Sequence, residues 1–217
     1  MRSPIFGVIL ALSIFGPNAD ASPETGFWDW FKKHEPELFD FENHPGNIFA
    51  ALAEQLAKVD PNLTFELGQI KEGKRDFIIS AEGVKNAFPA VSALAGAAPE
   101  LPRWRIVRFQ PRRSSLSIVT LAGVTLAPND VAFTYRVENG KLSLTLYIDG
   151  YDKSKHATYA GIGYLLLDEI LGEYDLGTEI SLIEFKAANA ASRLPKLPLK
   201  ALPDIVDKTV ESKPARN

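Results

Sequence analysis

The stretch that decides the fold covers residues 131–148 and reads VAFTYRVENGKLSLTLYI. Two runs of alternating apolar and polar residues flank Asn139-Gly140, a dipeptide that favours a two-residue hairpin turn with positive φ at both positions. Such a turn fixes the register of the two strands. The expected partners are Glu138–Lys141, Val137–Leu142, Tyr135–Leu144, Phe133–Leu146 and Val131–Ile148. The apolar pairs fall on one face, which we expect to be core, because a shift of one residue would scatter them.

The segments before this hairpin alternate between helical and extended patterns. Apolar residues recur at helical spacing over residues 27–33 and 45–59, and Pro36 is expected to interrupt the first helix or to begin a new turn. Alternating residues predict strands. These strands are expected at residues 63–67, 76–79, 104–109 and 116–121. Ser80 is expected to cap a further helix that is broken at Pro89.

The segments after the hairpin add a helix, a last strand and an unusual tail. A helix is predicted from His156 to a C-cap at Gly172, followed by a strand at residues 179–185. From Ser192 onward leucine alternates with proline, which suits an extended strap better than a helix or a central strand. The strap either docks in a groove of its own chain or stays disordered until a partner protein binds it.

Together these patterns predict an α+β fold. We expect a single domain with a mainly antiparallel sheet, packed helices and an extended Leu/Pro-rich C-terminal strap. Residues 1–21 are assigned to a signal peptide, residues 22–191 to the α+β domain, and residues 192–217 to the strap and a disordered polar tail.

The first residues contain the three parts of a secretory signal in order. Arg2 supplies a positive charge, residues 5–15 form an apolar run, and Ala19-Asp20-Ala21 has the small-x-small pattern of a cleavage site. The run is too short for a permanent membrane span, and no cysteine follows it to carry a lipid. The other interpretation is a core helix that is never removed. Because the composition is typical of bacteria, we expect a periplasmic or secreted protein without a stable membrane anchor.

Composition narrows the classes of function. The chain has 217 residues, 46% of them hydrophobic, which is enough for a sizeable core. Its formal net charge of -3 argues against a nucleic-acid partner, since binding to phosphate backbones needs a basic excess. The chain has no cysteine, which excludes disulfides, thiolate nucleophiles and Cys-based zinc sites.

Recognisable catalytic motifs are missing. The sequence has no nucleophile elbow, phosphate-binding loop, zinc-protease motif or calcium loop, so we expect no cofactor. The histidines are His34, His44 and His156. They are not spaced as metal ligands, and no metal site is expected.

One cluster of charged residues is acidic. It consists of Asp168, Glu169, Glu173 and Asp175. Glu169 and Glu173 are one helical turn apart and are expected to share a helix face. The cluster can supply a general acid and a general base, but we favour a solvated outer face opposite the apolar stripe of the helix.

A second cluster is basic and surrounds Trp104 and Phe109. It consists of Arg103, Arg105, Arg108, Arg112 and Arg113. Arginine beside aromatic residues can bind phosphate, carboxylate or another anionic ligand, so these five residues are the candidate anion-binding patch. Strand alternation splits them between two faces, and some of them can instead pair with the acidic cluster.

Several motifs resemble those of a family of uncharacterised bacterial proteins that share a domain of unknown function. They are FWDWF at residues 27–31, FELG at 65–68, ISAEGVKNAFPAV at 79–91, RFQPRR at 108–113 and GYLLLDEILGEYD at 163–175. The resemblance covers most of residues 27–185 and implies one domain rather than two. It implies no activity.

Two functions therefore stay open. The first is a non-catalytic binding or interaction module, with an anionic ligand or a protein as its partner, and the missing catalytic motifs favour it. The second is a hydrolase-type enzyme that uses carboxylates and arginines on an anionic or envelope substrate. Convergence of Asp168, Glu169 and Arg112 in one cleft would favour the enzyme.

The predicted signal peptide can be tested on protein from the native host. If the signal is cleaved after Ala21, the intact mass should correspond to a chain that begins at Ser22, and the protein should be in the periplasmic or secreted fraction. A full-length mass in the cytoplasmic fraction would show that the apolar run is a retained helix.

Overall fold

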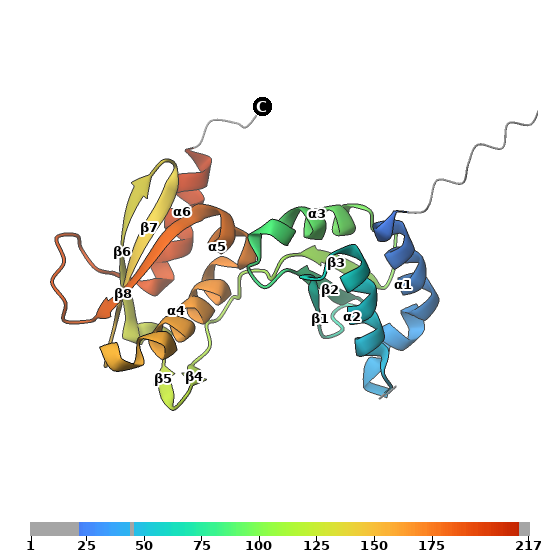
Figure 1. The fold of residues 1–217 in the computed structure, drawn as a ribbon, viewed down its shortest axis with the longest axis horizontal. Coiled ribbons are helices and arrows are strands. Elements are labelled where there is room, and N and C mark those ends of the chain that lie inside the picture. The colour runs from blue at the N-terminus through green and yellow to red at the C-terminus, as the bar shows by residue number, and fades with distance from the viewer. Residues whose placement is uncertain (1–21, 44–45, 213–217) are drawn as a thin grey trace, which may run out of the picture.

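The computed structural model describes residues 22–43 and 46–212, which form two lobes joined at a waist (Figure 1). The predicted signal peptide at residues 1–21, His44 and the end of the predicted tail lie outside the described residues. The predicted α+β class is confirmed. Buried side chains form two clusters, one from residues 27–109 and one from residues 124–206. We call the parts around them the N-terminal lobe and the C-terminal lobe.

The N-terminal lobe combines a three-stranded sheet with helices packed on it (Figure 1). Its elements are α1 (Pro23–Phe39), α2 (Ile48–Val59), β1 (Thr64–Leu67), β2 (Arg75–Ser80), α3 (Phe88–Gly96) and β3 (Trp104–Arg108). β1 pairs antiparallel with β2, and β3 pairs parallel with it. The core is largely aromatic: Phe31 of α1 and Phe77 of β2 are fully buried, with ring centroids 5.0 Å apart.

The first helix is longer than expected. α1 continues through Pro36 instead of stopping there, because only one turn follows the proline and that turn buries Leu38 completely. Trp28 of the same helix is buried, with 2% of its surface exposed. Its indole N–H donates a hydrogen bond of 2.8 Å to the carbonyl of Leu94.

The segment after β2 also differs from its prediction. Ser80 is the last residue of the strand, and its hydroxyl accepts the backbone N–H of Glu82 instead of capping a helix. α3 begins only at Phe88, with Pro89 in its first turn. The backbone N–H groups of the first helical turn have no partner within the helix, so proline, which lacks an N–H, costs no hydrogen bond there. Pro89 therefore lies at the start of a helix that it was expected to break.

The C-terminal lobe contains the predicted hairpin in the predicted register. β6 (Val131–Glu138) and β7 (Lys141–Ile148) pair from Val131↔Ile148 to Glu138↔Lys141 around Asn139-Gly140, whose φ values are 52° and 71°. The apolar face is buried over most of its length, as expected. Val137 is the exception, with 53% of its surface exposed, because it lies beside the turn at the end of the hairpin.

The hairpin is the centre of a four-stranded sheet with the order β8-β7-β6-β9. The remaining elements of this lobe are β4 (Val119–Leu121), β5 (Val124–Leu126), α4 (His156–Leu171), α5 (Glu173–Glu179), β8 (Ile180–Ala187), β9 (Leu197–Pro198) and α6 (Leu202–Glu211). β8 runs parallel to β7 at one edge of the sheet. The small β4–β5 ribbon packs against α4, and α5 lies at the waist (Figure 1).

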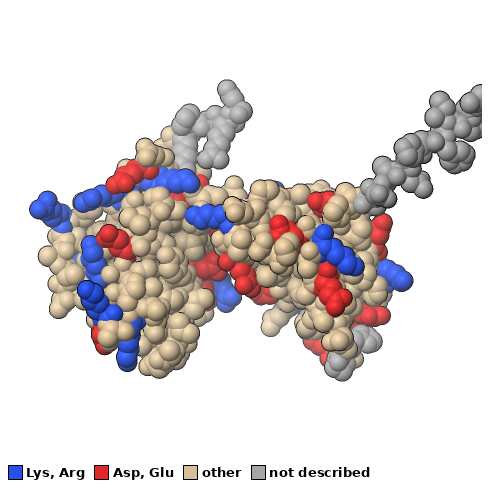
Figure 2. Space-filling view, viewed as in Figure 1, with Lys and Arg blue, Asp and Glu red and all other residues tan. Residues whose placement is uncertain are grey.

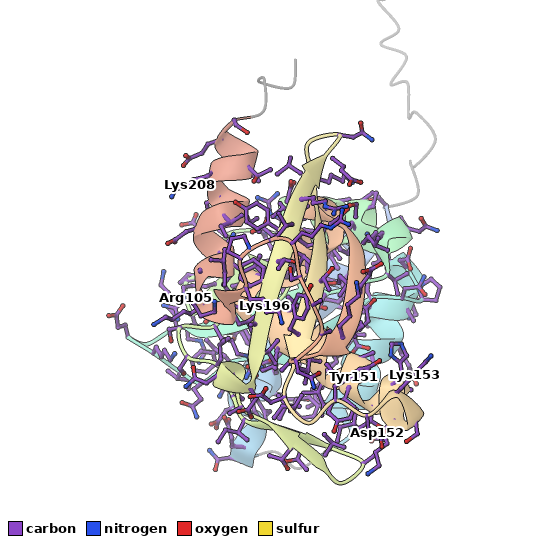
Figure 3. The ribbon with its side chains drawn as sticks, turned by 90° about the vertical axis from the view of Figure 1, so that its left-hand side faces the viewer. Arg105, Tyr151, Asp152, Lys153, Lys196 and Lys208 are labelled. Atoms are coloured by element: carbon purple, nitrogen blue, oxygen red, sulfur yellow. The ribbon has the colours of Figure 1, made fainter. Side chains whose placement is uncertain are left out.

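The Leu/Pro-rich segment lies on its own lobe. Its extended part includes β9, which pairs with β6. The ammonium group of Lys196 donates to the carbonyls of Ala188 and Ala190 over 2.6 and 2.8 Å. The same group lies 4.1 Å from the centroid of the Tyr147 ring, on the outer side of the sheet (Figure 3).

The second part of this segment is a helix that the sequence patterns did not predict. Pro203 lies in the first turn of α6, where proline is favoured because its missing N–H has no partner within the helix. Leu199, Leu202 and Val206 are buried in the core of the C-terminal lobe. Leu199 and Leu202 thus belong to the core, whereas Leu194 is 38% exposed, and the extended strap is shorter than expected.

Candidate functional site

The two lobes are joined by Glu173, a residue that we had placed on a solvated helix face. Its side chain is only 2% exposed. One carboxylate oxygen accepts the backbone N–H groups of Ala81 and Gly83 over 2.9 and 3.1 Å. The other oxygen accepts the N–H of Gln110 over 3.1 Å. A carboxylate of the C-terminal lobe is therefore bound by backbone donors of the N-terminal lobe and of the chain that leaves it.

Gly172 allows this close approach. Its φ is +73°, and a Cβ at this position would lie 2.9 Å from the carbonyl oxygen of Gln110. Gly172 ends α4, as predicted, and Glu173 begins α5. The helix face expected to be shared by Glu169 and Glu173 was therefore wrong, because the two residues lie on different helices.

Aromatic packing strengthens the same junction. The ring of Tyr174 lies 5.0 Å from that of Phe109 and 6.0 Å from that of Phe88, measured between centroids. A Cβ at Gly177 would lie 2.7 Å from the Phe88 ring. The absence of a side chain at Gly177 thus lets α5 pack directly on the start of α3.

On one side of this junction the lobes enclose a cleft of about 960 Å³. The N-terminal lobe lines the cleft with the start of β1 and with the turn that follows β2. The C-terminal lobe lines it with α4, α5 and residues 180–183 of β8. Tyr164, Leu165 and Leu182 face this space and are 48%, 49% and 55% exposed.

The charged residues that line the cleft are mostly acidic. The acidic residues are Glu66, Glu82, Asp168 and Glu173, and the basic residues are Lys85 and Arg113. Figure 2 shows acidic side chains gathered at the waist between the lobes. Burial raises the pKa of the Asp168 carboxyl, and the nearby negative charge of Glu173 raises it further, against the opposing charge of Arg113.

The five arginines of the predicted patch are distributed over the molecule. Four of them form salt bridges, and three of these pairs are Arg103 with Glu35, Arg105 with Asp76 and Arg113 with Glu169. Arg113 lines the cleft, whereas Arg103, directly before β3, and Arg105, near the start of β3, do not line it. The alternative that some arginines pair with the acidic cluster is confirmed for Arg113 with Glu169 and for Arg112 with Asp175.

The other two arginines border a second hollow of about 480 Å³. Arg108 is exposed there. Arg112 contacts Asp207 of α6 over 2.6 Å and Asp175 of α5 over 2.7 Å. These hydrogen bonds, first to Asp207 and then to Asp175, raise the pKa of the Arg112 guanidinium. Arg112 thus links the C-terminal helix to the waist, and an anionic ligand at this patch stays a prediction.

The described residues show neither a metal site nor a membrane span. No three histidine or carboxylate side chains within residues 22–43 and 46–212 are grouped so that they could hold a metal ion. His34 stacks on Trp30, and His156 bonds to the hydroxyl of Tyr151. Over the same residues, none of the helices is both long and apolar enough to cross a bilayer.

No known relative was found. Comparisons with protein-family models, with curated protein sequences and with solved structures gave no match. The family resemblance carried by the motifs therefore stays a prediction, and function has to be inferred from the cleft itself.

Replacing Glu173 tests its role at the junction. In Glu173→Gln the side-chain NH₂ group replaces one acceptor, so at least one backbone N–H at the waist loses its partner. A bond to a charged group contributes about 1.5–3 kcal/mol, so we expect the free energy of unfolding in urea to fall by at least about 2 kcal/mol. Hydrogen exchange should accelerate at Ala81, Gly83 and Gln110. The control Glu37→Gln, at an exposed position, should change neither the free energy of unfolding nor these exchange rates. Equal effects of the two variants would show that Glu173 does not hold the lobes together.

Asp168 should make stability depend on pH. A raised pKa in the folded state means that the folded protein binds this proton more tightly than the unfolded chain, whose value is about 3.9. Stability is therefore lost as the pH rises through the folded pKa. Asp168→Asn should raise the melting temperature at pH 7, and the difference should shrink towards pH 4. The exposed Asp149→Asn is the control, and a pH-independent difference for Asp168→Asn would contradict the shift.

Proposed function

We propose that this chain is an exported, non-catalytic binding module and that the cleft between its lobes is the binding site. The observation that carries the proposal is the group of large apolar side chains left about half exposed in one hollow, namely Tyr164, Leu165 and Leu182. Soluble proteins rarely leave such residues together in water unless a partner covers them. The volume of the cleft also falls in the range usual for binding sites.

The hydrolase-type alternative has less support. It needs Asp168, Glu169 and Arg112 in one place, but Arg112 borders the second hollow while Asp168 lines the cleft. Glu173 also lines the cleft, yet its carboxylate already accepts three backbone N–H groups. That arrangement suits an anchor between lobes better than a general base.

Export is part of the proposal, and the start of the first helix is consistent with it. Ser22, the first residue of the predicted mature chain, caps α1 by accepting the N–H of Thr25 over 3.3 Å. The helix therefore needs no residue before Ser22 for its N-cap. The partner is expected outside the cytoplasm.

Photo-crosslinking in the native host tests the cleft. A benzophenone amino acid at Leu182 should form a crosslinked species that Leu165→Arg abolishes, because the added charge blocks the same hollow from α4. Ile118 provides the matched control: it is an apolar residue with 69% exposure that does not line the cleft. A benzophenone at Ile118 should give no such species.

Two results would overturn the proposal. One is crosslinking at Leu182 that persists unchanged in the Leu165→Arg background. The other is crosslinking of equal yield at Ile118, which would mean that exposure alone, and not the cleft, determines the contact.

A further inference from the structure

One wall of the cleft is the free edge of a sheet. β8 is the outermost strand of the order β8-β7-β6-β9, and residues 180–183 at its start line the cleft. Within the described residues the backbone of β8 pairs only with β7. Such an edge leaves alternate N–H and C=O groups directed away from the sheet, where an added strand can bond to them.

This part of the edge carries no charged residue and no proline, and its pairing with β7 shifts register by one residue between Ile180 and Leu182. Charged residues and proline commonly protect edges from pairing, but residues 180–183 read ISLI. The charged residues of β8, Glu184 and Lys186, come later in the strand and form a salt bridge of 2.9 Å with each other. The stretch without charged residues or proline is thus the stretch inside the cleft.

Apolar side chains flank this stretch. Leu182 projects from β8 itself and is 55% exposed. Tyr164 belongs to α4 and contacts Phe185 of β8 edge to face, with ring centroids 5.5 Å apart, so α4 lies directly beside the strand. A segment added to β8 would therefore place side chains against Tyr164 and its neighbour Leu165.

The charge of the cleft indicates which side chains of a partner fit it. Of the charged residues that line it, four are acidic and two are basic. Arg113 lies 3.7 Å from Glu169, so Asp168 shares the positive charge of that arginine with a second carboxylate. The cleft keeps an excess of negative charge that a basic residue of a partner can neutralise.

We propose that the occupant is an extended segment of a partner protein that adds to the edge of β8 and alternates apolar with basic side chains. This rests on the proposed function and names the class of partner for the same cleft. Backbone bonds to residues 180–183 align the segment, its apolar side chains cover Tyr164 and Leu165, and its basic side chains lie among the acidic residues.

Fluorescent peptides of about eight residues, a usual strand length, test this directly. A peptide of alternating valine and lysine should bind the whole protein in an anisotropy titration at low salt. The same peptide with glutamate in place of lysine should bind at least about tenfold more weakly, because it meets like charges. Asp168→Asn should weaken the lysine peptide, whereas Asp149→Asn, an exposed residue outside the cleft, should not.

The peptide backbone provides the second measurement. N-methylation removes a donor and adds bulk without altering the protein. Methylating one set of alternate amides of the lysine peptide should abolish binding, and methylating the other set should leave it, because only every second amide faces β8. Equal binding of both methylated peptides would refute strand addition, and equal binding of the glutamate peptide would refute the charge preference.

Failure of this inference is distinguishable from failure of the proposed function. If no peptide binds but crosslinking at Leu182 still depends on Leu165, the cleft is a binding site for a different class of partner and strand addition is wrong. If both measurements are negative, the cleft is not the binding site.

Discussion

The carboxylate of Glu173 is withdrawn from water at the waist, where three backbone N–H groups compensate its charge. Burial of a carboxylate is strongly unfavourable without such bonds, so the donors and the acceptor have to occupy fixed positions. The donors come from the turn after β2 and from Gln110, and the acceptor begins α5. These bonds, together with the packing of Tyr174 on Phe88 and Phe109, hold the lobes in place and so determine the shape of the cleft.

The features predicted correctly from the sequence are those encoded by neighbouring residues. The hairpin needed only the turn at Asn139-Gly140 and the alternation on either side, and its register agreed at every pair. The end of α4 was likewise predicted from a local signal, the glycine at position 172. Pro36 was misinterpreted because tertiary burial of the turn beyond it outweighed a local preference.

The candidate site could not be predicted in the same way. The bonds to Glu173 join residues that are 92 positions apart for Ala81 and 63 apart for Gln110. Nothing near position 173 distinguishes a carboxylate that receives distant donors from one on a solvated surface. Gly172 was a local sign that α4 ends before Glu173. It indicated that Glu173 does not share a helix face with Glu169, but it did not indicate where the partners of Glu173 lie. The position of β8 at the edge of its sheet could not be predicted from the sequence either, because strand order depends on the whole sheet.

The salt bridges of Arg112 give the C-terminal helix a role in the order of folding. Arg112 contacts Asp175 at the waist and Asp207 on α6, the last helix along the chain within the described residues. A ribosome releases this helix after every other described element has been made. During synthesis the N-terminal lobe can therefore form its core early, while the contact between Arg112 and Asp207 forms only when α6 has emerged. An unfinished chain leaves Arg112 without Asp207 and the C-terminal core without Leu202 and Val206.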